Sequence, residues 1–119
     1  MLSKGLAYEK IAQTYLLKAG LKTVNTNFHC RSGEIDLIMQ DKETLVFVEV
    51  RYRNNAKYGS ASESVNIHKQ KKIIKSAEYY LNIKQLWHLA VRFDVIAISP
   101  SIKLLGKNKI TWHKSAFIC

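Results

Sequence analysis

Apolar residues recur along the chain with two different periods, and these periods predict its secondary structure. The first helical pattern lies between residues 3 and 19, at Tyr8, Ala12, Tyr15, Leu16 and Ala19. Gly20 follows it, in the place of a glycine that ends a helix. The second pattern runs from about Val65 to Leu81, with one apolar side formed by Ile67, Gln70, Ile73, Ile74, Ala77 and Leu81. We therefore expect two helices that each bury one face.

Shorter runs of apolar and β-branched residues predict extended strands. They span residues 22–29, 33–40, 44–53 and 89–98, and residues 102–113 predict a closing hairpin that turns at residues 106–108. Residues 54–64 are polar and small, which indicates a loop. Because the chain has no internal repeat and no linker, we expect one α/β domain over residues 1–119, in the order αβββαβ with a last hairpin.

Two adjacent strands carry acidic residues within apolar sequence, in the stretch "GEIDLIMQDKETLVFVEVRYR" at residues 33–53. If residues 42 and 43 form the tip of the turn, counting along an antiparallel ladder places Asp36 opposite Glu49. The same count places Glu34 opposite Arg51. The alternate positions form an apolar face that must lie against a helix, and they are Ile35, Leu37, Met39, Val46, Val48 and Val50.

Directly opposed acids would repel each other, because paired residues have Cβ atoms roughly 5 Å apart. A divalent cation between Asp36 and Glu49 would remove the repulsion, and Mg²⁺ takes such carboxylate ligands at phosphoryl-transfer sites. A solvated face of salt bridges is the alternative, with Glu34 paired to Arg51 and Glu49 paired to a lysine. A slip of one residue in the register would also remove the acid pair.

Arg51 follows Glu49 by two residues and therefore shares its face of the strand. The resulting pattern, Asp36 followed by Glu49-Val50-Arg51, resembles that of the PD-(D/E)xK nuclease superfamily of restriction endonucleases and Holliday junction resolvases. More closely, the chain is similar to the YraN family of small uncharacterised bacterial proteins. The blocks that match in order are "AYEKIAQTYLLKAG", "NFHCRSGEIDLIMQDKETLVFVEVRYR", "YGSASESVNIHKQKKIIKSAEYYL" and "RFDVIAIS".

This resemblance implies a restriction-endonuclease-like fold, with a mixed sheet flanked by two helices. It implies a metal-dependent DNA endonuclease of resolvase type that uses Mg²⁺ or Mn²⁺. Asp36, Glu49 and Glu9 would be the metal ligands, Arg51 would take the place of the catalytic lysine, and Gln70 would be a further catalytic residue. For Glu9 a solvated side chain is the alternative, and for Gln70 an ordinary buried hydrogen bond.

Arg51 departs from the lysine that is usual in the family. Its guanidinium holds a phosphate well, but it does not deprotonate and its planar shape differs from that of an ammonium group. The alternative function is therefore a nucleic-acid-binding module that keeps the nuclease fold without its chemistry.

The charge of the chain indicates that its binding partner is a polyanion. Lys and Arg number 19 against nine Asp and Glu, for a formal net charge of +10. Nucleic acid, DNA by the resemblance, is the first candidate; an anionic membrane surface and RNA are the others. The residues expected to contact its phosphates are Arg51, Arg53, Lys69, Lys71, Lys72 and Lys75. A solvated basic helix face is the alternative for the lysines.

Other features of the sequence complete these expectations. The two cysteines are too few for a disulfide framework, and no run approaches the roughly 18 apolar residues of a membrane span, so we expect a cytoplasmic protein. In so small a chain we expect Trp87 and Trp112 to be buried as core anchors, with base stacking as the alternative. Asp94, in a buried strand, predicts an ion pair with Arg92. The sequence gives no indication of the oligomeric state.

Overall fold

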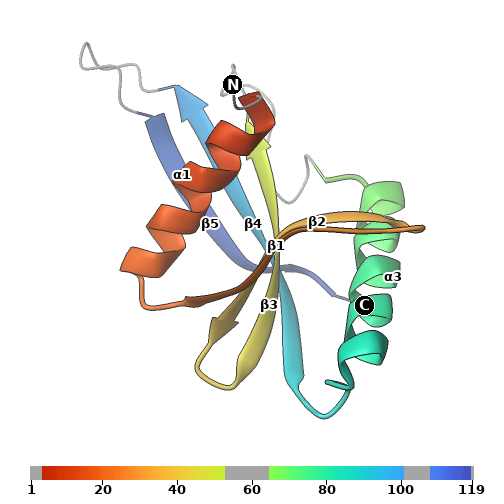
Figure 1. Ribbon diagram of the computed structural model, residues 1–119. Helices are drawn as coiled ribbons and strands as arrows, with labels where there is room; N and C mark the ends of the chain where they lie inside the picture. The colour runs from red at the N-terminus through yellow and green to blue at the C-terminus, as the bar shows by residue number, and fades with distance from the viewer. Residues whose placement is uncertain (1–3, 53–64, 101–107, 119) are drawn as a thin grey trace.

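The computed structural model describes residues 4–52, 65–100 and 108–118, which form a five-stranded sheet with a helix on each side (Figure 1). The elements are α1 (Lys4–Lys18), β1 (Lys22–Cys30), β2 (Gly33–Asp41), β3 (Thr44–Tyr52), α3 (Ile67–Lys84), β4 (Ala90–Pro100) and β5 (Asn108–Phe117). This order confirms the predicted αβββαβ arrangement, and one further strand, β5, follows it. The α/β class, with a mixed sheet flanked by two helices, is also confirmed.

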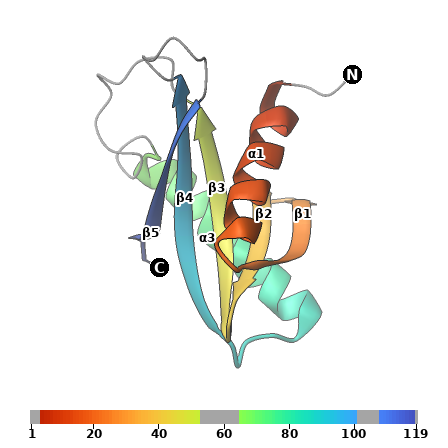
Figure 2. The same ribbon diagram turned by 90° about the vertical axis from the view of Figure 1, so that its left-hand side faces the viewer.

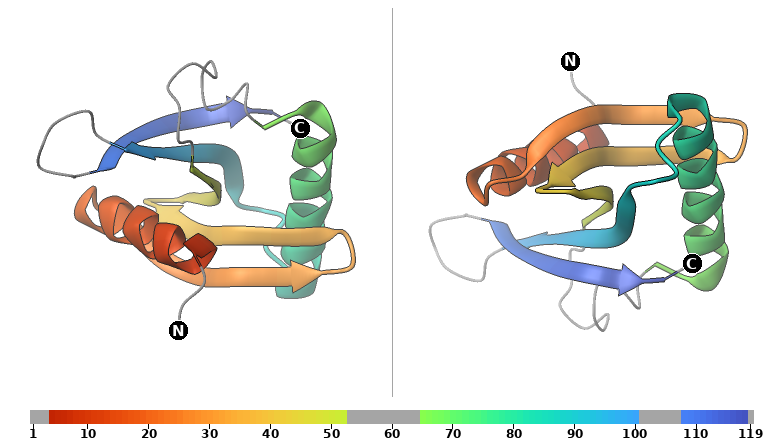
Figure 3. Two further views of the ribbon diagram at one scale, coloured as in Figure 1. Left: turned by 90° about the horizontal axis from the view of Figure 1, so that it is seen from above. Right: turned by 90° about the horizontal axis from the view of Figure 1, so that it is seen from below.

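The strands follow one another across the sheet in sequence order. Only β3 and β4 run parallel, because α3 connects them, whereas the other neighbouring pairs are antiparallel. Figures 2 and 3 show α1 and α3 on opposite faces of this strongly twisted sheet. Of the hairpin predicted over residues 102–113, the second strand corresponds to β5, which pairs with β4. Asn108, expected in its turn, already pairs with Pro100 in the ladder, and residues 101–107 lie outside the described part of the chain.

Helix α1 ends where its sequence indicates. Gly20 has a φ of +102°, a conformation that favours glycine, and its N–H donates to the carbonyl of Leu17 at 3.0 Å. The N–H of Leu21 then donates to the carbonyl of Leu16 at 3.1 Å, which completes a Schellman ending. Ala12 and Leu16 are fully buried against the sheet. The predicted limits of this helix are therefore confirmed to within about one residue.

Helix α3 begins two residues later than predicted and continues one turn further. Asn66 caps it, since its side chain accepts a hydrogen bond from the N–H of Lys69 at 2.9 Å. Gln85 ends it in the left-handed conformation, at a φ of 56°. Ile67, expected on the apolar side, is 65% exposed, because it is the first helical residue and burial of the helix begins at Ile73. Neither described helix is long and apolar enough to cross a membrane.

Each face of the sheet carries its own apolar cluster, so both helices are held by burial of large side chains, worth about 1.5–3 kcal/mol each. The α1 cluster contains Ala12, Leu16, Leu21, Leu37, Met39, Val46, Val48, Ile96 and Ile98. The α3 cluster contains Ile35, Ile38, Leu45, Phe47, Val65, Ile73, Ala77, Tyr80, Phe93, Val95 and Phe117. The face that carries the acids is therefore also buried over most of its length.

The predicted register of β2 and β3 is confirmed from Asp41–Thr44 up to Leu37–Val48, where the backbone ladder ends. The apolar positions of this hairpin lie on the α1 side as expected, with one exception. Ile35 was expected among them, but it packs in the α3 cluster. The reason is that β2 separates from β3 beyond Leu37, and Figure 3 shows the end of the β1–β2 hairpin reaching over α3.

Candidate active site

The last four residues of β3 border a pocket of about 230 Å³ that is also lined by α1, β2 and α3. Its lining residues are Gly5, Tyr8, Glu9, Glu34, Asp36, Glu49, Val50, Arg51, Tyr52 and Lys69. We call it the acid pocket. It brings together five of the residues singled out from the sequence, although these come from four separate elements of the fold.

Asp36 lies where the ladder between β2 and β3 stops. Its Oδ2 accepts a hydrogen bond of 2.8 Å from the backbone N–H of Val50. A side chain thus replaces the next ladder bond and satisfies a backbone donor that would otherwise lose its partner. Asp36 is next to Glu49 as predicted, but this bond to Val50, and not a continuous ladder, holds it there.

Glu49 is a buried acid, with only 5% of its surface exposed. Burial raises its pKa to about 8, and the nearby charge and hydrogen bond of Asp36 contribute to the rise. Two cations oppose this effect, since Lys69 Nζ lies 3.7 Å and Arg51 Nη1 3.8 Å from Glu49 Oε2. Both separations exceed a normal hydrogen bond, so the carboxylate is only partly compensated.

Glu9 reaches the acid pocket from α1. Burial raises its pKa to about 7, and the negative charges of Asp36 and Glu34 raise it further, whereas a hydrogen bond with Asn27 lowers it. Its Oε1 is buried and has no hydrogen-bond partner among the residues that the structure describes. A buried acceptor without a donor is uncommon in folded proteins, and it indicates a place where a cation or a donor is expected.

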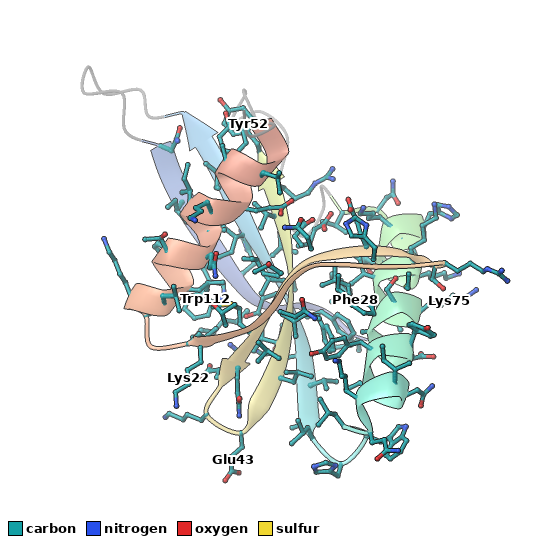
Figure 4. All side chains as sticks on the ribbon, viewed as in Figure 1. Lys22, Phe28, Glu43, Tyr52, Lys75 and Trp112 are labelled. Carbon is teal, nitrogen blue, oxygen red and sulfur yellow. The ribbon has the colours of Figure 1, made fainter. Side chains whose placement is uncertain are left out.

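A pair of tyrosines holds α1 against the end of β3. The rings of Tyr8 and Tyr52 stack with centroids 4.1 Å apart and an interplanar angle of 14°. Each ring neighbours a polar residue of the pocket in the sequence, Glu9 on α1 and Arg51 on β3 (Figure 4 labels Tyr52). The stack therefore helps to position Glu9 and Arg51 at the acid pocket. This contact was not predicted from the sequence, although Tyr52 continues the alternation of Val46, Val48 and Val50 toward α1.

The comparisons with known proteins identify the family. Residues 8–98 match the family described as "Uncharacterised protein family UPF0102". The chain belongs to this family. It is the YraN family that the sequence blocks resembled, so that recognition is confirmed.

Relatives match the chain along nearly its whole length. UPF0102 proteins of Stutzerimonas stutzeri, Legionella pneumophila subsp. pneumophila and Psychromonas ingrahamii are 43%, 46% and 50% identical to it. The matches cover 97%, 96% and 97% of this chain and 94%, 93% and 89% of theirs. Among solved structures, that of Pyrococcus furiosus SfsA in complex with Ca²⁺ has a TM-score of 0.40 and 15% identity, over 92% of this chain and 62% of that one.

Other predicted site residues of this UPF0102 protein lie outside the acid pocket. Gln70 donates from Nε2 to the carbonyl of Val65 at 2.8 Å, which is the ordinary hydrogen bond considered as its alternative role. Lys71, Lys72 and Lys75 are exposed on α3 and do not line the pocket. Arg53 lies outside the described residues. Of the four predicted lysines of α3, Lys69 therefore lines the acid pocket and the other three do not.

Glu34 and the tryptophans differ from expectation. The ladder that would place Glu34 opposite Arg51 ends earlier, and its carboxylate lies 3.4 Å from Nδ1 of His29. Trp112 is half-buried against the α1 cluster, as predicted for a core anchor. Trp87 is 62% exposed, so its prediction as a core anchor is wrong. It follows the end of α3, beyond the part of the helix that packs on the sheet.

The donor set of the acid pocket suits a hard divalent cation, which prefers carboxylate oxygens. Glu9 and Glu49 both interact with Asp36, and Glu9 Oε1 is an unused buried acceptor. Within residues 4–52, 65–100 and 108–118, however, no three acidic, histidine or cysteine side chains already converge as ligands of one ion. A cation would therefore require these acidic side chains to move closer together.

Proposed function

We propose that this UPF0102 protein is a metal-dependent endonuclease of resolvase type that hydrolyses phosphodiester bonds in DNA. The observation that supports this function is the gathering of Glu9, Asp36 and Glu49 in one pocket beside two cations. Glu49 is buried and Glu9 and Asp36 are half-buried, so the three acids repel one another, and a divalent cation is the chemical group that would relieve this repulsion. A purely structural cluster has no need of the third acid.

Asp36, Glu49 and Glu9 would hold Mg²⁺ or Mn²⁺, which would polarise the scissile phosphate as a Lewis acid. The two basic residues of the acid pocket have a different role. Arg51 and Lys69 place positive charge beside the acids, where the negative charge of the phosphoryl oxygens increases in the transition state. A guanidinium binds two such oxygens at once, so Arg51 is suited to orient the phosphate.

The surface around the pocket supports a nucleic acid as the substrate. The chain has a net charge of +10, and Lys71, Lys72 and Lys75 lie exposed on the helix that supplies Lys69. Such lysines contact phosphates and carry no base specificity. The substrate is accordingly selected by the path of its backbone more than by its sequence.

A nucleic-acid-binding module without catalysis is the second candidate, and one observation favours it. Lys69 and Arg51 already lie within 4 Å of Glu49, so protein cations neutralise part of the charge that a metal would neutralise. In this alternative a phosphate binds to Arg51 and Lys69, and the acids only position these two side chains.

A cleavage screen separates the two functions. Single-stranded, duplex, flapped and four-way DNA are incubated with Mn²⁺, or with chelator, and with the Asp36→Asn variant. Asparagine keeps an oxygen acceptor for the Val50 N–H and removes the charge, so the fold is retained. We expect Asp36→Asn to lose about a hundredfold or more in cleavage rate, in line with the loss of a group that stabilises the transition state.

The matched control is Asp41→Asn, which changes an acid of the same strand outside the pocket. It should retain the wild-type rate. Cleavage that persists in chelator or in Asp36→Asn contradicts the metal-dependent mechanism. Binding of these substrates without cleavage of any of them would support the non-catalytic nucleic-acid-binding module.

A further inference from the structure

The outer face of α3 changes along its length from basic to aromatic. Its exposed side chains recur at intervals of three and four residues, at His68, Lys72, Lys75, Tyr79 and Ile83. This spacing places them in one stripe along the helix. Figure 4 shows Lys75 on the side of α3 that faces away from Phe28. The ring of Tyr79, in contrast, lies beside β1, with its centroid 6.3 Å from that of Phe28, while half of the residue's surface stays exposed.

The aromatic end of this stripe is unusually apolar for a solvated surface. Tyr79 is 50% exposed, Ile83 49% and Trp87 62%. The indole N–H of Trp87 donates to Oδ1 of Asn82, which lies in the last turn of α3. This bond holds the indole beside the last turn of α3, while most of its surface stays in contact with solvent.

The charge around these rings indicates the kind of partner. Helix α3 carries five lysines and one acid, Glu78. Aromatic rings beside a basic track are typical of surfaces that bind single-stranded nucleic acid, whose unpaired bases stack on the rings while lysines contact the phosphates. A membrane is the less suitable partner, because the opposite face of α3 is buried in the core and the helix cannot turn to insert.

We propose that the outer face of α3 binds an unpaired strand of nucleic acid, with phosphates along Lys72 and Lys75 and bases on Tyr79 and Trp87. Lys69 begins the same helix and lines the acid pocket, so the strand extends from the pocket along a helix of about 27 Å. The inference rests on the proposed function and narrows its substrate to DNA with a single-stranded segment beside the cleaved phosphate.

Binding is measured in chelator, where the proposed cleavage cannot occur, by the fluorescence of single-tryptophan variants. The chain has two tryptophans, so Trp112→Phe reports Trp87 alone, and Trp87→Phe reports Trp112, whose indole is bonded to Asp94. An oligothymidylate of about 20 nucleotides should quench Trp112→Phe and leave Trp87→Phe unchanged. An abasic strand of the same length, which offers phosphates without bases, should quench neither.

Affinity measurements test the stacking residues separately. Tyr79→Ala and Trp87→Ala should each weaken binding of the oligothymidylate by about tenfold, the usual effect of losing one stacked base. The matched control is Leu17→Ala, which removes a side chain of similar exposure, 46%, from α1. It should bind as the wild type does. If Trp112→Phe does not fold, the quenching of the wild type compared with that of Trp87→Phe gives the same information.

Unchanged affinity in both α3 variants, or an equal loss in Leu17→Ala, would overturn the proposal. So would a blue shift of Trp87 on phosphatidylglycerol vesicles without quenching by the oligothymidylate, which would assign the face to a membrane surface. The outcome is independent of catalysis. Quenching without cleavage in Mn²⁺ would contradict the nuclease function and support binding of an unpaired strand to α3. Cleavage without quenching would support the nuclease function and contradict strand binding to α3.

Discussion

Two buried acids, Glu49 of β3 and Asp94 of β4, lie on adjacent strands, and their charges are compensated in different ways. Asp94 of β4 is completely buried, and each of its oxygens has donors. Arg92 Nε lies 3.1 Å and 3.2 Å from the two oxygens, the indole of Trp112 donates at 2.9 Å, and the N–H of Ser115 donates at 2.9 Å. The predicted ion pair with Arg92 is confirmed.

The acid pocket lacks this complete set of donors. Glu49 has its cations at 3.7 Å and 3.8 Å, and Glu9 has a buried oxygen that no donor of the described part of the chain reaches. Both glutamates have pKa values raised to about neutrality or above, chiefly by burial. Burial alone therefore does not mark a functional acid. The distinguishing property is a buried carboxylate whose hydrogen bonds are incomplete, and it separates the acid pocket from Asp94.

Removal of the satisfied acid should have the largest effect on stability. Asp94→Ala leaves the partly buried Arg92, the Trp112 indole and the Ser115 N–H without their acceptor, and breaking a buried ion pair costs about 3–5 kcal/mol. We expect a loss of that size in the free energy of unfolding by urea, with no direct effect on the acid pocket. Asp41→Ala removes only the more exposed partner of Arg92 and serves as the control, with a smaller loss. Equal losses in the two variants would contradict the comparison.

Local sequence patterns were sufficient for the order of elements and for the ion pair of Asp94. The turn at residues 42 and 43 sets the register of β2 and β3, and Arg92 lies two residues from Asp94, on the same side of the strand. In both cases the interacting residues are close in sequence or related by a short turn. Simple counting along a strand then gives the correct neighbours.

Contacts that depend on twist or on distant elements could not be predicted in this way. Ile35 changes face because β2 leaves β3 at Leu37, and this separation follows from the twist of the whole sheet. The stack of Tyr8 on Tyr52 requires the crossing of α1 over β3. The place of Glu9 in the pocket came from the family resemblance, and its missing hydrogen-bond partner could be found only in three dimensions.

Removal of Glu49 should change the stability in the opposite direction to removal of Asp94, and the change should depend on pH. The native pKa of Glu49, about 8, exceeds the value of roughly 4.3 in an unfolded chain. Between these values the native state keeps a proton that the unfolded state has released, so the wild type loses stability as the pH rises. Glutamine does not titrate and avoids this loss.

We therefore expect Glu49→Gln to be more stable than the wild type at pH values near 8, and to lose this advantage near pH 4.3. The measurement is urea unfolding in chelator across this range. Glu43→Gln, at the exposed tip of the β2–β3 turn labelled in Figure 4, is the matched control and should follow the wild type. If the stability of Glu49→Gln changes with pH as that of the wild type does, Glu49 does not have the raised pKa on which this prediction depends.

The smallest expected effect concerns Arg51, the cation that completes the unsatisfied site. It lies 3.8 Å from Glu49, so a lysine at this position keeps a positive charge near both the acid and a bound phosphate. Unlike arginine, lysine can also exchange a proton with the attacking water. We expect Arg51→Lys to increase cleavage in Mn²⁺ about tenfold, which corresponds to about 1.4 kcal/mol in the barrier.

Nucleic-acid affinity distinguishes this catalytic gain from tighter binding, since Arg51→Lys should leave the dissociation constant of the preferred DNA nearly unchanged. Arg51→Gln, which removes the charge, is the matched comparison and should weaken both binding and cleavage. A lower rate in Arg51→Lys would mean that the planar guanidinium is itself needed to orient the phosphate. The acid pocket would then be a site adapted to arginine, in which Glu49 positions Arg51 as Asp94 positions Arg92 on the neighbouring strand.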